Sequence, residues 1–449
     1  MIEVKLYKII GASLLLSLIA APAPSQSIVE RNQATTQSRF IDPVSGVTSD
    51  DLVKRALEQN GELQAARQMI AEARGRWRQA GLKANPMIEA SGMRAATSPD
   101  NNQMVGIELP LELNGRRRAR VDVAAREIEM REAEVRDFER KLAAEVRMKY
   151  AEAIAAARNL KFSDDLLALT RESHRLTAAR VDLGKSAPLE QNLLFVEMSR
   201  VEATRIGFES RAEVAMLELK KVLGMLPEEA LLLRDELAAG WQPPSQSEVI
   251  NQVLLKRPDL IAARAAESLA AAQLEQARVE GRVDAGIFAN YERMSFGYGV
   301  RGFNDASVLV PVTGVFHNLT FGVKVALPTR NKNQGNIEAA AAALDAARIR
   351  REFAEKVARN EIAAAYARFN HAGQAMNLYS EKVLKNAARN LDVIRQTYEF
   401  GQKTVLDYIA EQRRYVEIET GFTDLLKEYF DARVEIERAT ASSDQYRER

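Results

Sequence analysis

The sequence predicts a mainly α-helical protein with a smaller β part, built from two copies of one structural unit. Charged residues make up 28% of the 449 residues and aromatic residues only 6%, a composition typical of long helices that pack on one another. Two long segments, 115–183 and 336–400, contain no proline and carry apolar residues spaced by threes and fours, as amphipathic helices do. Shorter segments ahead of them, such as "QMVGIELPL" and "FHNLTFGVKVALP", alternate between apolar and other residues, which indicates antiparallel strands.

The order of these elements occurs twice along the chain. The stretches "ELPLELNGRRRARV" and "ALPTRNKNQGNIEA" both run from Leu-Pro through a polar turn into a helical segment, with Pro110 and Pro328 at equivalent places. Each long helix then meets a glycine, Gly184 or Gly401, and a returning helix follows. Glycine adopts the backbone angles that close a helical hairpin. A recurring order of elements indicates a tandem duplication.

A further pair of matching segments precedes the strands. "QNGELQAAR" and "KRPDLIAAR" each read as a break followed by a helix, with Leu63 aligned to Leu260 and Arg67 aligned to Arg264. Apolar residues recur at helical spacing on both sides of the break. We therefore expect each repeat to begin with helices that lead into its β-hairpin.

The duplication divides the chain into segments. Residues 1–25 are predicted to be a signal peptide, because lysines precede a short apolar run that small residues follow. Residues 26–47 are polar and are expected to form an extended linker. The first repeat then covers 48–225, with a helix, a β-hairpin over 86–110 and a long helical hairpin over 115–223. A linker over 226–247 leads to the second repeat.

The second repeat has the same plan, which sets the expected architecture. It covers 248–449, with a helix, a β-hairpin over 283–328 and a long helical hairpin over 333–440. After the signal peptide, no apolar run approaches the roughly 20 residues of a membrane helix, so entry into a membrane would require a β-barrel. Four strands cannot close a barrel, and three copies would supply twelve. We therefore expect a trimeric 12-stranded transmembrane β-barrel continued by a periplasmic α-helical barrel, with the two prolines at the junctions.

Charge and residue usage narrow the classes of function. The net charge is +1 and the chain has no cysteine, so we expect no nucleic-acid partner, no disulfide and no thiolate metal site. The three histidines lie far apart, without metal-ligand spacing. The motif "GYGVRG", Gly297–Gly302, has a dinucleotide-binding pattern but lies among alternating β segments, so we expect an extracellular hairpin loop. The sequence thus predicts no catalytic residue, no cofactor and no resident metal.

Several of these features together resemble a known family. The duplication, the "RPDL" motif at Arg257–Leu260, the two Leu-Pro junctions and the two glycine turns resemble the outer-membrane efflux channel family of TolC-like outer membrane factors. The junction sequences are most similar to its heavy-metal branch, the CzcC/CusC-like members. The resemblance covers the whole mature chain. Members of that branch often carry a lipidated cysteine, and this chain departs from them because it has none.

The resemblance implies a passive duct and no enzyme activity. It implies a homotrimer in the outer membrane of a Gram-negative bacterium, in contact with outer-membrane lipid and with a large periplasmic part. A periplasmic adaptor (membrane fusion protein) would join it to an inner-membrane pump of the RND type, and heavy-metal cations would be the exported solute. Drug efflux and type I protein secretion remain open within this class. A periplasmic adaptor or a coiled-coil scaffold is the alternative from another class.

The resemblance also implies a gate at the two turns. Asp407 matches the family's acidic ring at the narrowest point, whereas a second acidic position is Ala410 here. Tyr398, Lys403 and Glu190 match a network of Tyr, Arg and Asp that holds the entrance shut. Lysine in place of arginine loses bidentate geometry. The alternative is that these are solvated turn residues, whose ion pairs contribute under about 1 kcal/mol.

The same turns would form the tip on which the adaptor docks. The resemblance places Gly184, Lys185, Gly401 and Gln402 there, and a purely structural C-cap is the alternative role of the glycines. A basic run, Arg116–Arg120, opens the first long helix. If the junction lies at the inner face of the outer membrane, these arginines would contact lipid phosphates or acidic neighbours. A solvated helix start is the alternative.

Overall fold

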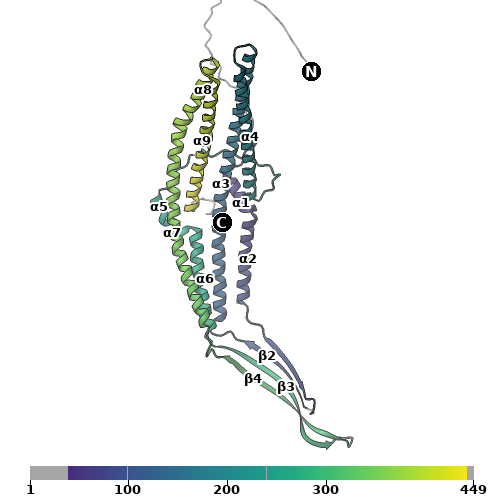
Figure 1. The fold of residues 1–449 in the computed structure, drawn as a ribbon. Coiled ribbons are helices and arrows are strands. Elements are labelled where there is room, and N and C mark those ends of the chain that lie inside the picture. Colours follow the sequence, from purple (N-terminus) through teal and green to yellow (C-terminus); the bar gives the residue numbers. More distant parts are fainter. Residues whose placement is uncertain (1–38, 99, 239, 442–449) are drawn as a thin grey trace, which may run out of the picture. The chain divides into compact units, whose positions relative to one another are not determined.

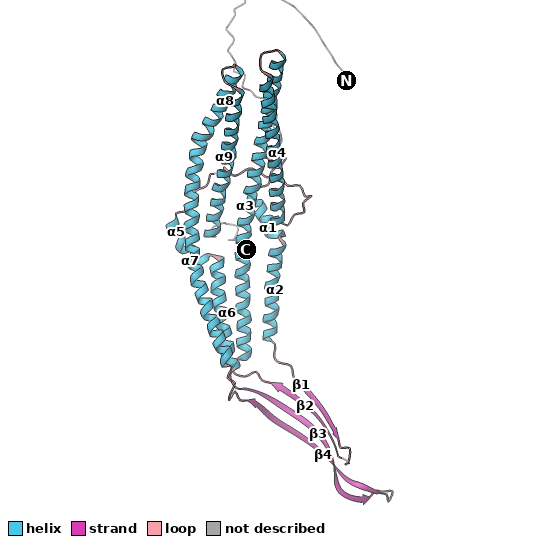
Figure 2. Cartoon of the chain, in the orientation of Figure 1, coloured by secondary structure: helices cyan, strands magenta, loops and turns pink. Residues whose placement is uncertain are grey.

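The computed structural model of the chain describes residues 39–98, 100–238 and 240–441 (Figures 1 and 2). The predicted signal peptide over 1–25 lies outside these residues, as does most of the predicted linker over 26–47. The described part of the chain is mainly helical and contains four antiparallel strands. This confirms the predicted class of a mainly α protein with a small β part.

The elements follow each other in the order that the duplication predicts. The first repeat contains α1 (Ser49–Gln59), α2 (Gly61–Gly81), β1 (Met87–Arg94), β2 (Asn101–Pro110), α3 (Arg116–Asp182) and α4 (Pro188–Leu223). The second contains α5 (Gln246–Lys256), α6 (Pro258–Glu280), β3 (Asp284–Phe303), β4 (Leu309–Ala326), α7 (Gln334–Leu378), η1 (Tyr379–Leu384), α8 (Lys385–Glu399) and α9 (Val405–Thr440). Both repeats thus place two helices before their strands.

Local signals explain the break between those two helices. In the first repeat, Asn60 ends α1 and caps α2, because its side chain accepts a hydrogen bond from the backbone N–H of Leu63 at 3.0 Å. In the second repeat, Pro258 occupies the first position of α6. Proline suits this position, because an N–H there would have no hydrogen-bond partner within the helix. The two repeats therefore make the same break with different residues.

The two long helices differ in their continuity. The first, α3, runs without interruption for 67 residues, which corresponds to about 100 Å at 1.5 Å per residue. Its counterpart is divided by the π-helical segment η1 between α7 and α8. Tyr379 opens this segment, and its hydroxyl oxygen would lie 3.2 Å from a Cβ placed on Gly421 of α9. A proline-free apolar pattern does not reveal such a π-turn, because the helix on either side keeps its period.

The largest hydrophobic core lies where α1, α3 and α4 meet the segment after α4. Leu52, Tyr150 and Leu233 are fully buried in it. Phe40 packs against the same core, and Val47 forms a parallel bridge with Leu233. The described part of the predicted N-terminal linker is therefore packed against the first repeat.

The four strands form one antiparallel sheet in the order β1-β2-β3-β4 (Figure 2). Because β2 pairs with β3, the hairpins of the two repeats join in a single sheet. The motif "GYGVRG" lies within β3, at a register irregularity between Gly297 and Arg301. Our prediction of a loop there was wrong, since the β3–β4 turn comes later, over 304–308. Cross-strand pairing of the flanking residues extends the strand through the glycines.

The sheet connects to the helices at one end. Helices α2 and α6 lead into β1 and β3, and α3 and α7 follow β2 and β4 (Figure 1). The long helix α3 packs against α2, α4, α6 and α9, and α7 packs against α6 and α9. Among the helices that the structure describes, none combines the length and the apolar composition of a membrane span.

Candidate functional site

The sheet has two chemically different faces. Residues directly opposite each other in antiparallel register point to the same side, so Val105, Tyr291 and Leu319 share one face. Toward the helices, the neighbouring positions on this apolar face are also apolar and exposed: Ile88, Ile107, Leu109, Ile287, Phe321 and Val323. Toward the opposite end of the sheet, the same face carries a polar row of Gln103, Arg293 and His317, and the hydroxyl of Tyr291 lies 2.6 Å from Nδ1 of His317. An exposed apolar surface of this kind indicates contact with an apolar phase or a partner.

The opposite face carries most of the polar groups of the sheet. Asn102 donates a hydrogen bond to the carboxylate of Glu292 at 2.6 Å, and the ammonium of Lys324 lies 3.2 Å from the carboxylate of Glu108. The apolar exceptions on this polar face include Phe288 and Met104, and the further polar members are Asn290, Asn318 and Thr320. A sheet with one apolar and one polar face can separate hydrocarbon from water.

The strand-to-helix junctions contain the two predicted prolines. Pro110 is the last residue of β2 and lies opposite Gly286 of β3, and Pro328 follows β4. Proline ends a strand without leaving an unpaired N–H. Each junction then places a residue with left-handed backbone angles before its helix, Gly115 with φ 82° and Asn333 with φ 63°. The two junctions therefore share the start of the helix, whereas the first has Glu112 and Asn114 at positive φ in the turn before it.

The turns at the far ends of the long helices are also equivalent. Gly184 has φ 68° and Gly401 has φ 75°, so both need the left-handed conformation that glycine adopts freely. The N–H of Lys185 donates to the carbonyl of Arg180 at 2.8 Å, and the N–H of Gln402 donates to that of Thr397 at 2.9 Å. These bonds close the two helix C-termini in the same way. The side chains of Lys185 and Gln402 are exposed.

Each turn also exposes two large apolar side chains, which sequence reasoning did not single out. Leu183 and Leu189 in the first turn are 70% and 65% exposed, and Phe400 and Leu406 in the second are 80% and 59% exposed. The four residues occupy equivalent positions around Gly184 and Gly401. An apolar pair on each of two solvated turns indicates a protein contact surface.

Asp407 is part of the helix start of α9. Its backbone N–H donates to the hydroxyl of Thr404 at 3.2 Å, and its carboxylate accepts from the N–H of Thr404 at 3.1 Å, which is a capping box. The hydrogen bond from the Thr404 N–H, the hydroxyl bond and the charge of Lys403 all lower the pKa of Asp407. The side chain is exposed. The structure therefore holds an ionised carboxylate at a fixed place on the turn.

Glu190 occupies the equivalent place at the start of α4. It lies in the first turn of that helix, but the N-cap there is Ala187, whose side chain makes no capping bond. Each returning helix therefore presents one carboxylate in its first turn, and only Asp407 is held by a cap. Sequence reasoning assigned Asp407 to an acidic ring and Glu190 to a latch, whereas the two residues are structural equivalents.

Tyr398 connects the two long helices near their turns. Its side chain is buried, its hydroxyl lies 3.0 Å from the hydroxyl of Thr177 on α3, and its ring stacks on Tyr408 with centroids 5.7 Å apart. Burial and the nearby negative charge of Glu190 raise the pKa of Tyr398. Thr177 is a site residue that sequence reasoning missed. Its polar side chain at a buried position of α3 was the available signal.

The predicted latch is brought together only in part. The charge of Glu190 acts on Tyr398, and that of Lys403 acts on Asp407. In the part of the chain that the structure describes, no hydrogen bond joins Tyr398 to Lys403 or Glu190. Arg180 on α3 instead donates to the carbonyl of Glu399 at 2.7 Å. Among the described residues, the hydrogen bonds from α3 to the second turn therefore come from Thr177 and Arg180, and from Ser173, whose hydroxyl lies 3.2 Å from that of Tyr408.

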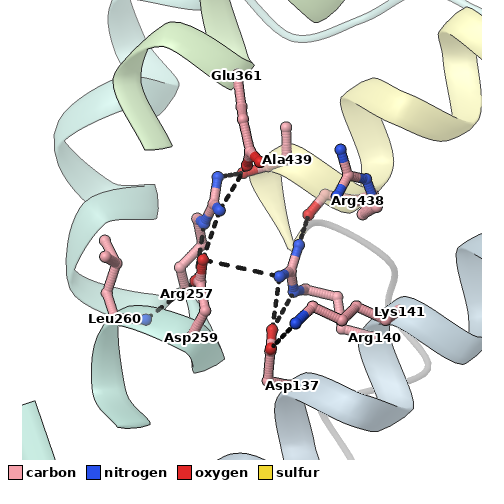
Figure 3. A network of polar contacts seen from close by, with 9 residues as sticks. All are labelled: Asp137, Arg140, Lys141, Arg257, Asp259, Leu260, Glu361, Arg438 and Ala439. Atoms are coloured by element: carbon pink, nitrogen blue, oxygen red, sulfur yellow. Dashed lines mark hydrogen bonds and ion pairs between the residues drawn. The ribbon is translucent and has the colours of Figure 1, made fainter. Parts of the chain in front are cut away.

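A buried ionic network lies at the other end of α9 (Figure 3). Arg257, from the "RPDL" motif, is 2% exposed. Its guanidinium binds Asp259 at 2.9 and 2.6 Å and Glu361 of α7 at 2.7 Å. It also donates to the carbonyl of Ala439 in the last turn of α9 at 3.3 Å. One side chain thus joins α6, α7 and α9.

A second arginine reaches the same helix end from the first repeat. Arg140 of α3 binds Asp137 at 2.5 Å and donates to the carbonyl of Arg438 at 2.7 Å (Figure 3). Its guanidinium also lies 3.8 Å from the carboxylate of Asp259. Cations suit a helix C-terminus because its last carbonyls are unpaired and the helix dipole is negative there. The network therefore fastens the end of α9 to both repeats.

The first repeat makes the equivalent contact without charge. Asn60 aligns with Arg257 in the two helix breaks, and its amide donates to the carbonyl of Val222 in the last turn of α4 at 2.9 Å. The duplication therefore keeps the contact, and the second repeat replaces a neutral donor by a buried cation. Among the described residues, no cluster of three His, Asp or Glu side chains has the arrangement of a metal site.

Comparisons with known proteins agree with this geometry. The family model described as "Outer membrane efflux protein" matches residues 52–225 and 249–442. The "Cobalt-zinc-cadmium resistance protein CzcC" of Cupriavidus metallidurans is 22% identical over 396 residues, which are 87% of this chain and 89% of that protein. The "Nickel-cobalt-cadmium resistance protein NccC" of Alcaligenes xylosoxydans xylosoxydans is 28% identical over 145 residues, 31% of this chain and 33% of that protein.

Solved structures show the same fold. The chain is similar to CusC with a TM-score of 0.71 at 18% identity, covering 87% of this chain and 91% of that one. It is similar to the CmeC outer membrane channel of Campylobacter jejuni with a TM-score of 0.71 at 15% identity, covering 89% of this chain and 88% of that one. It is similar to the outer membrane protein VceC of Vibrio cholerae with a TM-score of 0.69 at 19% identity, covering 87% of this chain and 95% of that one. Because the family model covers both repeats, the chain belongs to the outer membrane efflux protein family, as the resemblance predicted.

Proposed function

We propose that this chain is the outer-membrane channel of a tripartite efflux system. The observation that carries the proposal is the two-faced sheet. One chain supplies four strands, with β1 and β4 as its edges, and an exposed apolar face opposite a polar one. Two further copies would pair with these edges and close a barrel with lipid outside and water inside. The helices would continue this duct on the periplasmic side.

The helical turns support a role in docking. Two turns per chain, each with an exposed apolar pair and a tight glycine, would give a homotrimer six equivalent tips. A periplasmic adaptor with helical hairpins fits such tips, because apolar side chains on one helix end can pack into the grooves of another. The adaptor would in turn connect the channel to an inner-membrane pump, which we expect to be of the RND type.

Heavy-metal cations are the solute that we favour. The relatives CzcC and NccC are named as resistance proteins for cobalt, zinc and cadmium and for nickel, cobalt and cadmium. Asp407 and Glu190 would place carboxylates at the entrance of the duct, and rings of acidic side chains favour cations. Drug efflux and type I protein secretion are the alternatives within this class.

The deciding experiment combines extraction, conductance and growth. The mature chain should need detergent for extraction, run as a trimer in detergent, and form channels in planar bilayers. Deleting its gene should raise sensitivity to cobalt, zinc or cadmium salts. Sensitivity to organic drugs alone would favour the drug-efflux alternative. A monodisperse, water-soluble particle without conductance would instead support an adaptor or a scaffold and reject the channel.

Asp407→Asn is expected to weaken block of the pore by multivalent cations about tenfold, because a ring of carboxylates would lose its charge. An amide oxygen can still accept the hydrogen bond from Thr404, so the helix start should survive. Bilayer recordings with a titrated divalent cation give the blocking affinity. Thr404→Ala is the matched control, since it breaks the cap and keeps the charge. Equal block by Asp407→Asn and the wild type rejects the ring.

Glu190→Ala combined with Tyr398→Phe is expected to raise single-channel conductance. The double change removes the Tyr398 hydroxyl, which lies 3.0 Å from Thr177, and the charge beside it. Thr177→Val should raise conductance as well if this hydrogen bond holds the helices together at the entrance. Wild-type conductance in both variants would show that the latch lies elsewhere.

A further inference from the structure

A cavity lies at the foot of the sheet in the first repeat, next to the apolar face. Its volume is about 710 Å³, and it is bounded by the α2–β1 connection, the end of β2 and the start of α3. Its wall combines apolar residues of the strand with three basic side chains. Those that matter here are Lys83, Leu109, Leu111, Arg117 and Arg118.

The basic run at this junction divides into two groups. Arg116 binds Asp284 at 3.0 Å, and Arg120 binds Glu112 at 2.7 Å, so these two arginines tie the junction together. Arg117 uses only its Nε, which donates to the carbonyl of Gly81 at 2.7 Å. Arg118 and Lys83 are exposed and have no hydrogen bond or ion pair within the described ranges. Three cationic groups therefore remain available at the cavity.

One carboxylate also lines the cavity, but it is already neutralised. Glu112 accepts hydrogen bonds from both terminal nitrogens of Arg120, at 2.7 and 3.4 Å. The hydrogen bond from Arg120 lowers the pKa of Glu112, so the pair carries one positive and one negative charge. The net charge of the cavity wall therefore comes from Lys83, Arg117 and Arg118.

The second repeat shows that folding of the junction does not need these charges. There the helix also starts after a residue in the left-handed region, Asn333, and the positions equivalent to Arg117 and Arg118 are Gly335 and Asn336. Cations at the start of a helix are also unfavourable, because the helix dipole is positive there. The basic residues of the second junction, Arg330 and Lys332, instead lie before the helix, at the positions equivalent to Glu112 and Asn114. Basic side chains at these two helix positions therefore cost stability and occur in the first junction alone, which indicates a ligand.

The position of the cavity identifies the ligand class. Leu109 belongs to the apolar face, opposite Ile287, and Leu111 continues from it toward the helices. A ligand in this place meets exposed apolar side chains on one side and three cations on the other. Both properties together match an anionic phospholipid, with its phosphate near the basic side chains and its acyl chains along the strands. Free inorganic phosphate would match only the cations.

We propose that this junction cavity binds the headgroup of an anionic phospholipid in the periplasmic leaflet of the outer membrane. Lys83, Arg117 and Arg118 hold the phosphate, and Leu109 and Leu111 contact the first part of the acyl chains. The inference rests on the proposed membrane function of the sheet. It adds a specific lipid contact at the first junction, where the second junction has Gly335 and Asn336 in place of two of the three cations.

The test compares two triple variants of the detergent-solubilised, delipidated full chain. K83Q/R117Q/R118Q removes the cavity charges. R350Q/K356Q/R359Q removes the same number of charges from exposed residues of α7 that have no partner among the described residues. Native mass spectrometry with phosphatidylglycerol, phosphatidylethanolamine or inorganic phosphate measures bound ligand. Each basic residue near an anionic surface contributes roughly a fivefold gain in affinity.

Phosphatidylglycerol affinity should therefore fall about a hundredfold in the cavity variant, which loses three such residues, and stay within about twofold in the control. Unchanged affinity in the cavity variant overturns the proposal, and so does equally tight binding of inorganic phosphate. Loss of the trimer in the cavity variant alone also overturns it, because a second copy would then occupy the cavity. Each of these failures leaves wild-type conductance intact. Failure of the proposed function would instead appear as a wild-type chain without conductance.

Discussion

Arg257→Ala is expected to lower the free energy of unfolding by about 3–5 kcal/mol, the range for removing one partner of a buried ion pair. The guanidinium is 2% exposed and makes contacts within 3.3 Å to Asp259, Glu361 and the carbonyl of Ala439. Its loss would leave two carboxylates beside each other and a helix carbonyl without its donor. Chemical denaturation of the detergent-solubilised protein, followed by circular dichroism, measures the change.

The control for this prediction is an exposed pair with similar geometry. Arg348 lies 2.9 Å from Asp345 on α7, and both side chains are more than half exposed. Arg348→Ala should change stability by less than about 0.5 kcal/mol, because solvent screens such pairs. Equal effects of the two substitutions would contradict the role of the network. Arg257→Lys should also destabilise, since an ammonium cannot reproduce the fork-shaped contact with Asp259.

The pH dependence of stability follows from the same network. Burial opposes the charge of Asp259, but the hydrogen bond and charge of Arg257 outweigh it, so the pKa of Asp259 is lowered from 3.8. A lowered folded-state pKa contributes stability that is present above the unfolded pKa and is lost as pH falls through the folded value. Wild-type stability should therefore decrease in acid below about pH 4, and Arg257→Ala should reduce this dependence.

Leu319→Lys is expected to prevent stable assembly in the membrane, whereas Thr320→Lys should be tolerated. The two residues are neighbours on β4, but Leu319 belongs to the apolar face and Thr320 to the polar face. Both lie in the middle of the stretch where all four strands pair. Lysine on the lipid side near the bilayer centre costs about 2–4 kcal/mol per chain. A trimer would multiply this cost by its three copies.

The fraction of detergent-resistant trimer recovered from membranes measures the difference between these two variants. Both variants add the same charge to neighbouring positions of the same strand, so they differ in the face that receives the charge. Comparable recovery would mean that the faces of the sheet do not separate lipid from water. Recovery of Thr320→Lys alone would support the proposed barrel.

Local patterns predicted the fold well because each pattern reports on its own neighbourhood. Alternating residues predicted the four strands, and apolar spacing predicted the long helices. Alignment of Leu63 with Leu260 also predicted equivalent packing, since both side chains are fully buried. Arg67 and Arg264 each donate to a carbonyl ten residues earlier, at 3.0 and 2.9 Å. These contacts are short-range, so a repeat in the sequence becomes a repeat in the structure.

The candidate site was harder to predict because its partners are distant in the sequence. Tyr398 bonds to Thr177, 221 residues away, and no pattern around either residue indicates the other. Asp407 and Glu190 are acidic residues at equivalent positions. At the start of α9, Thr404 and Asp407 bind each other in a capping box, whereas the N-cap of α4 is Ala187, which makes no side-chain hydrogen bond with Glu190. Which acid is held in place depends on a single neighbouring hydroxyl.

The amino-acid sequence by itself determines that the chain has two repeats, that its helices and strands follow a fixed order, and that glycine turns lie at two equivalent places. Those properties follow from short-range periodicity and backbone preference. The tertiary structure alone determines that Arg140 donates to a carbonyl 298 residues away. It also determines that two arginines of the basic run bind acids while Arg118 stays available, and that the strands of both repeats share one apolar face. Long-range packing selects these partners, because a charged or apolar side chain can pair with many others until the helices and strands meet.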